Sequence, residues 1–118
     1  MRSNVRQKMN SLQKLQEWYI ARCDGLWEHS SGIRIVTLDN PGWRMTINLA
    51  DTEFETMGFT AVDDEKSEDD WIQCWKDAEG FQAAGGPRNL EEMIGVFLRW
   101  KEQKLEQAAA SDGDKPPC

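Results

Sequence analysis

One stretch decides the fold: residues 33–49, which read IRIVTLDNPGWRMTINL. Two segments that alternate apolar or β-branched residues with polar ones flank the turn-forming residues Asp39-Asn40-Pro41-Gly42. Proline presets φ at the second corner of a turn and glycine tolerates a positive φ at the next, which favours a type II turn. The stretch therefore predicts a β-hairpin.

The residues before the hairpin have the periodicity of an amphipathic helix. Asn10 or Ser11 can cap its first turn, and Asp24-Gly25 provides a stop. The stripe expected to be apolar comprises Leu12, Leu15, Tyr19 and Cys23, and Trp18 and Ile20 widen it. A second helix is predicted to begin at Asn89, with Glu92 completing a pattern like a capping box.

Three further strands are expected between the hairpin and the second helix. They cover residues 57–63, 71–76 and 81–84, and the breaker Gly85-Gly86-Pro87 follows as a tight strand-to-helix turn. Helices at the two ends can both cover one face of the sheet. The sequence therefore predicts an α+β fold, an antiparallel sheet of four to five strands flanked by an N-terminal and a C-terminal helix.

The chain of 118 residues has the length of one domain. We expect a flexible N-terminus over residues 1–9, a single α+β domain over 10–107, and a disordered tail over 108–118. The sequence contains no apolar run long enough to cross a bilayer and no secretory signal. Its three cysteines lack C-x-x-C spacing, which fits a reducing compartment. These features predict a cytoplasmic protein.

Negative charge is concentrated in one segment of the chain. Between Asp51 and Asp70, nine carboxylates accompany a single base, Lys66, so this segment carries −8 while the whole chain carries −7. A concentrated negative field repels nucleic acid and anionic lipid, and it attracts a basic protein surface. We expect a basic protein partner and neither nucleic acid nor membrane. The alternative is a solvated loop that only keeps the protein soluble.

A tryptophan next to this segment can serve as an interface anchor. Trp71 and Trp75 share one face of a predicted strand, and Ile72 and Cys74 share the other. An exposed tryptophan inside a charged rim is the usual arrangement of an interface hot spot, whereas two packed tryptophans would be core. The first candidate partner-binding patch comprises Asp63, Asp64, Glu65, Glu68, Asp69, Asp70 and Trp71.

The only histidine, His29, lies in a segment that also holds a thiol and carboxylates. Cys23 as nucleophile and His29 as base, oriented by Glu28 or Asp24, would make a small hydrolase. The spacing matches no zinc or calcium site, and the catalytic constellation is incomplete. We expect no catalytic residue, metal or cofactor, and we keep a small hydrolase or metal-dependent enzyme that uses Cys23, Glu28 and His29 as the alternative.

Seven short motifs follow one another along residues 10–101. In order they are Leu15-Gln16-Glu17-Trp18-Tyr19, Cys23-Asp24-Gly25-Leu26-Trp27-Glu28-His29, Thr37-Leu38-Asp39-Asn40-Pro41-Gly42-Trp43, Asp70-Trp71, Gly85-Gly86-Pro87, Asn89-Leu90-Glu91-Glu92 and Phe97-Leu98-Arg99-Trp100. In this order and spacing they resemble the immunity protein 53 family of bacterial polymorphic toxin systems. Leu26 departs from the polar or acidic residue expected in relatives.

The resemblance implies a cytosolic antidote that binds a protein toxin, frequently a nuclease, and blocks it. A nuclease needs a basic groove for phosphates, and an inhibitor can fill that groove with carboxylates. The leading hypothesis is occlusion of a basic site by the acidic patch, with the oligomeric state left open. The motifs supply a second candidate patch, which comprises Asp24, Trp27, Glu28, His29 and Asp39.

Overall fold

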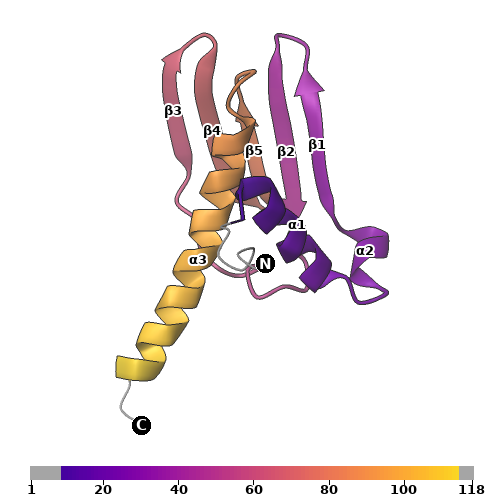
Figure 1. Cartoon of the computed structure of the whole chain (residues 1–118), viewed down its shortest axis with the longest axis vertical. Coiled ribbons are helices and arrows are strands. Elements are labelled where there is room, and N and C mark those ends of the chain that lie inside the picture. The colour runs from indigo at the N-terminus through magenta and orange to yellow at the C-terminus, as the bar shows by residue number, and fades with distance from the viewer. Residues whose placement is uncertain (1–8, 115–118) are drawn as a thin grey trace, which may run out of the picture.

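The structure, a computed structural model, describes residues 9–114, with side chains up to residue 103. It contains three helices and five strands (Figure 1). In chain order they are α1 (Ser11–Arg22), α2 (Trp27–Ser30), β1 (Ile33–Leu38), β2 (Gly42–Asn48), β3 (Val62–Ser67), β4 (Asp70–Asp77), β5 (Gly80–Gly85) and α3 (Leu90–Asp114). The predicted α+β fold with helices at both ends is confirmed.

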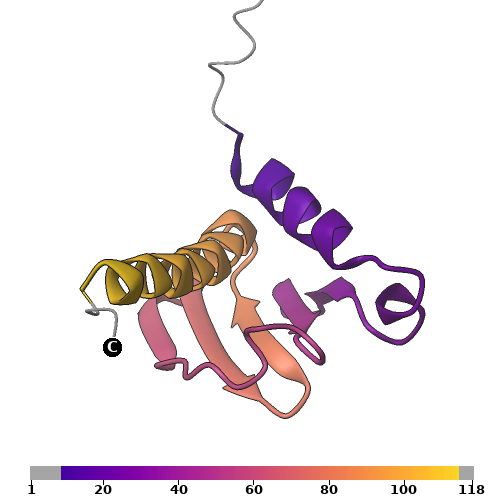
Figure 2. The same ribbon diagram turned by 90° about the horizontal axis from the view of Figure 1, so that it is seen from below.

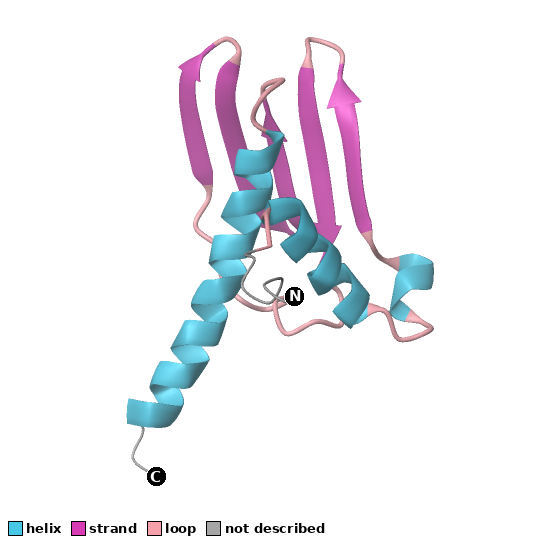
Figure 3. Ribbon diagram, viewed as in Figure 1, coloured by secondary structure: helices cyan, strands magenta, loops and turns pink. Residues whose placement is uncertain are grey.

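The five strands form one antiparallel sheet in the order β1-β2-β5-β4-β3 (Figure 3). Short turns join β1 to β2, β3 to β4 and β4 to β5, whereas residues 49–61 carry the chain from β2 to the far edge. Thus β5 lies at the centre, and β1 and β3 are the two edge strands. The turns β1–β2 and β3–β4 lie at the same end of the sheet.

Both long helices pack on one face of this sheet (Figures 1 and 2). Strand alternation directs Met45, Ile47, Cys74 and Phe81 toward them, and each of these side chains is at most 1% exposed. Phe97 of α3 contacts Trp18 of α1 edge to face, with ring centroids 5.1 Å apart. The core therefore lies between the helices and the sheet, and within the described residues no helix covers the opposite face, which we call the helix-free face.

The predicted hairpin is confirmed as β1 and β2, but its turn differs in detail. Gly42 does not adopt a positive φ. It begins β2 opposite Leu38, and a Cβ there would lie 2.4 Å from the carbonyl oxygen of Gly85. The glycine is needed because β2 and β5 approach closely at that point, so the type II turn was the wrong interpretation.

The third strand lies further along the chain than residues 57–63. It begins at Val62 and contains the acidic run itself. The apolar residues before it belong to a loop that covers one end of the core, where Phe59 contacts Phe81 and Trp100 edge to face. An edge strand can carry charge on both of its faces because water reaches both, and the sequence pattern did not reveal this.

Two details of the helices also differ from prediction. Asn10 forms a capping box with Gln13, but the buried residues of α1 are Leu15 and Trp18, whereas Leu12 is 53% exposed. The side chain of Asn89 does not cap α3 as predicted. Its Oδ1 accepts the backbone N–H of Trp71 at 3.4 Å, and its Nδ2 donates to Asp70 and Glu92 at 3.0 and 2.9 Å.

The predicted ends of the domain lie partly outside the described residues. α3 continues to Asp114, past the boundary at residue 107, and Ala108–Ala110 have the highest intrinsic helix propensity. Residues 115–118 of the predicted tail and residues 1–8 of the predicted N-terminus lie outside the described residues. The tight turn predicted at Gly85-Gly86-Pro87 is confirmed, with the Gly86 N–H donating to the carbonyl of Trp71 at 3.0 Å.

Candidate partner-binding surface

The first candidate patch forms a hairpin at the edge of the sheet. Residues 63–70 are all exposed, and they extend from β3 through its turn to the first residue of β4. Asp63 and Glu65 lie opposite Gln73 and Trp71 of β4, so they belong to the helix-free face. The register shifts between Glu65 and Ser67, and this irregularity together with the charge protects the edge from pairing with other strands. We call residues 63–71 the acidic hairpin.

Two carboxylates of the acidic hairpin already have partners. Asp64 lies 3.4 Å from Lys66 Nζ, and this contact raises the pKa of Lys66. Asp70 accepts a hydrogen bond from Asn89. Within the described part of the chain, the carboxylates of Asp63, Glu65, Glu68 and Asp69 have no ion-pair partner. Their negative field is therefore directed to solvent.

The structure settles which face of β4 is packed. Ile72 and Cys74 are buried against the helices at 3% and 1% exposure. Trp71 and Trp75 point the other way and are partly exposed. The two tryptophans are therefore not core residues, and Trp71 lies directly across from Glu65 in the neighbouring strand.

The second candidate patch is mostly a structural loop. Asp24 Oδ1 accepts the backbone N–H groups of Leu26 and Trp27, both at 2.9 Å. Glu28 bonds back to the start of the same loop, because its two oxygens accept the N–H groups of Asp24 and Gly25 at 2.9 Å. The bonds from Trp27 and Leu26 lower the pKa of Asp24, and the backbone N–H of Glu28 itself, followed by those of Asp24 and Gly25, lowers the pKa of Glu28.

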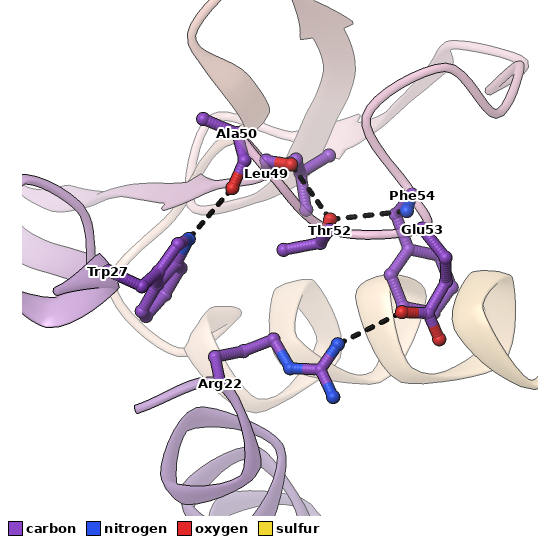
Figure 4. A network of polar contacts seen from close by, with 7 residues as sticks. All are labelled: Arg22, Trp27, Leu49, Ala50, Thr52, Glu53 and Phe54. Carbon is purple, nitrogen blue, oxygen red and sulfur yellow. Dashed lines mark hydrogen bonds and ion pairs between the residues drawn. The ribbon is translucent and has the colours of Figure 1, made fainter. Parts of the chain in front are cut away.

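Trp27 ties this loop to the core and is only 6% exposed. Its indole N–H donates to the carbonyl of Ala50 at 2.8 Å (Figure 4). The same figure shows Arg22 of α1 paired with Glu53 at 2.9 Å. Loop 49–54 is thus held to the N-terminal helices at two points, and most of the Trp27 side chain is buried.

The five residues of the second patch do not come together. His29 is exposed in α2, at one end of β1. Asp39 lies at the other end, in the β1–β2 turn, which shares its end of the sheet with the acidic hairpin (Figure 1). Asp39 therefore groups with the first patch by position.

The hydrolase alternative gains no support from this geometry. Cys23 Sγ donates to the carbonyl oxygen of Tyr19 at 3.2 Å, and both oxygens of Glu28 are occupied by backbone N–H groups. Burial raises the pKa of the Cys74 thiol to about 12. Among the described residues, no group of three His, Cys, Asp or Glu side chains could hold a metal ion.

Sequence reasoning missed the polar centre of the helix-free face. Gln82 of β5 is only 1% exposed although no described helix covers it. Its Oε1 accepts from Arg44 at 2.9 Å and from Thr46 at 2.8 Å, and the Arg44 guanidinium lies 4.9 Å from the Trp75 ring centroid. The available signal was the alternation in β2, which places Arg44 and Thr46 on the face opposite Met45 and Ile47.

Comparison with known proteins identifies the family. The family model described as Immunity protein 53 matches residues 12–102. The chain belongs to the immunity protein 53 family. No curated protein and no solved structure matches it. The match spans all five strands of this immunity protein, so it includes both candidate patches. Among the described residues, no helix is long and apolar enough to cross a membrane.

Proposed function

We propose that this immunity protein binds a cognate protein toxin in the cytoplasm and neutralises it by covering a basic site. The observation that carries the proposal is the acidic hairpin of a chain in an immunity family. Among the described residues, four of its six carboxylates have neither an ion pair nor a side-chain hydrogen bond, and they lie on an edge strand and in its turn to β4. Charge placed in this way is available to another molecule.

The mechanism is stoichiometric occlusion, with the field acting before contact. Exposed charges act over a Debye length of about 8 Å at physiological salt, and complementary fields raise association rates. A toxin that binds phosphate backbones, such as a nuclease, presents the cationic groove that a carboxylate-rich edge complements. In contact, Trp71 adds buried apolar area to the charge pairs.

The acidic hairpin suits this role better than loop 24–29. Asp24 Oδ1 and the two oxygens of Glu28 together accept hydrogen bonds from four backbone N–H groups. A partner that bound these oxygens would have to break those bonds. Binding through the hairpin costs no such rearrangement. We assign Asp24, Trp27 and Glu28 to folding, and Asp63, Glu65, Glu68, Asp69 and Trp71 to the partner.

Co-expression tests the proposal directly. The toxin domain encoded beside the gene for this chain is expressed with the wild-type protein or with a variant that carries Glu65→Gln, Glu68→Gln and Asp69→Asn. A matched control neutralises Glu91, Glu102 and Glu17, which lie on α3 and α1. We expect rescue of growth by wild type and control and weakened rescue by the hairpin variant. Failure of wild type to rescue, with the folded protein present, would refute the proposal.

A further inference from the structure

The helix-free face has a preorganised centre and an open site beside it. At the centre, Gln82 Nε2 donates to Asp77 at 3.1 Å and to Glu79 at 3.3 Å, and these bonds complement those that its Oε1 accepts. The hydrogen bond from Gln82 is the largest of the effects that lower the pKa of Asp77. Side chains held this way lose little conformational freedom when a partner arrives.

One tryptophan of this face, Trp75, already makes a cation–π contact within the chain. The guanidinium of Arg44 lies over Trp75 and donates to Gln82. A guanidinium over an indole ring is attracted by the negative face of the π system. On this sheet surface, an arginine of the chain itself is thus held by an indole ring and an amide oxygen together.

The second tryptophan of the face, Trp71, borders a hollow of about 490 Å³. It forms because β5 ends at Gly85, opposite Ile72, whereas β4 continues to Asp70. The hollow is lined by Asn40, Glu65, Lys66, Ser67, Glu68, Trp71 and Gln73. Lys66 is the cation in this lining, and its ammonium group is paired with Asp64, on the helix side of β3.

Building on the proposed function, we propose that the toxin docks on the helix-free face and inserts an arginine or lysine side chain into the hollow beside Trp71. The hollow offers the same kinds of group that hold Arg44, an indole from Trp71 and a side-chain amide from Gln73, and it adds the carboxylates of Glu65 and Glu68. A cation there gains both a π contact and charge-assisted hydrogen bonds.

Charge complementarity identifies the occupant as cationic. A phosphate or an acidic peptide would be repelled by Glu65 and Glu68. An apolar side chain would bury the same carboxylates without partners, which costs more than the contact gains. The Arg44–Trp75–Gln82 centre then provides a rigid floor next to the inserted side chain.

A titration with a minimal probe tests the hollow without the toxin. The full chain, labelled with ¹⁵N, is titrated with N-acetyl-arginine methylamide and, separately, with its uncharged isostere N-acetyl-citrulline methylamide. Indole N–H signals are assigned from Trp71→Phe and Trp75→Phe. We expect the arginine probe to shift the Trp71 signal, with little change at Trp75, and Glu65→Gln to weaken the shift severalfold. Equal shifts with both probes, or none at Trp71, would overturn the proposal.

Binding to the cognate toxin domain separates this inference from the proposed function. We expect Trp71→Ala to raise Kd about 30-fold, as for a central interface tryptophan, Trp71→Phe to raise it less, and Glu65→Gln to raise it about fivefold. Glu91→Gln, the matched control on α3, should bind as wild type. If wild type binds and all three hairpin variants bind equally well, the docking site and the role of the hairpin are wrong, whereas toxin binding by the chain stands. If wild type does not bind, the function itself fails.

Discussion

Loop 24–29 and the acidic hairpin carry the same kind of residue and use it in opposite ways. In the loop, Asp24 and Glu28 accept backbone N–H groups from their own segment. In the hairpin, Glu65 and Glu68 border an open hollow and have no ion-pair partner among the described residues. The difference teaches that a carboxylate in a family motif can serve folding, and that availability to a partner depends on which donors lie nearby.

The largest effect should come from the tryptophans of the two regions. Trp27→Ala removes a buried ring and its bond to Ala50, and we predict a loss of about 3–5 kcal/mol in the free energy of unfolding. Trp71→Ala should cost about 1 kcal/mol or less, because the ring is partly exposed. Urea unfolding of the two variants measures the contrast. Equal losses would remove the distinction between a structural and a functional region.

Neutralising the hairpin should slow association. With Glu65→Gln, Glu68→Gln and Asp69→Asn together, we predict that the association rate with the cognate toxin domain falls about 10- to 100-fold at low salt. The rates of variant and wild type should converge as salt screens the field. Stopped-flow fluorescence at several ionic strengths provides the rates. A rate that does not depend on salt in the wild type would contradict electrostatic steering.

Removing the Asp24 side chain should affect stability and not binding. Asp24→Ala leaves two backbone N–H groups without their acceptor, and we predict that Tm falls by about 4–8 °C. Asp24→Asn keeps an acceptor and should fall less. Calorimetry measures both, and the association rate with the toxin domain should stay at its wild-type value. Slower association by a fully folded Asp24→Asn would instead place the loop in the interface.

The smallest expected effect is on how Tm changes with pH when the loop carboxylates are neutralised. Because folding lowers the pKa values of Asp24 and Glu28, the unfolded chain takes up their protons first as pH falls. Their stabilisation is complete above the ordinary carboxyl pKa of about 4 and is lost as pH drops through the lower values of the folded state. We predict a smaller loss of Tm between pH 5 and pH 3 in an Asp24→Asn, Glu28→Gln double variant than in wild type. An equal loss would mean that these groups do not contribute.

Much of the fold followed from local patterns. Alternation and turn residues predicted β1, β2, β4 and β5, because each of these strands packs an apolar face toward the helices, although β5 is buried on both faces. The acidic β3 escaped prediction because an edge strand can keep its charges in water. The predicted stripe of α1 was right at Leu15 and Trp18 and wrong at Leu12, because Trp18 packs against Phe97 whereas Leu12 is exposed.

The candidate site was predictable in composition but not in arrangement. The acidic run and Trp71 are visible in sequence, but their distribution over two faces depends on the register with β4. The grouping of Asp39 with the hairpin depends on the strand order. The network around Gln82 joins β2, β4 and β5, so the alternation in β2 indicates which residues share its face but not which of them bond to one another.

Carboxyl footprinting of the complex tests the central claim most directly. The immunity protein, alone and bound to its cognate toxin domain, is labelled at exposed carboxylates with carbodiimide and glycine ethyl ester, and the labelled residues are read by mass spectrometry. We predict strong protection of Asp63, Glu65 and Glu68 on binding, with labelling of Glu91 and Glu102 on α3 unchanged. Protection confined to the α3 carboxylates, with the hairpin labelled as in the free protein, would contradict the assignment of the hairpin as the toxin-binding surface.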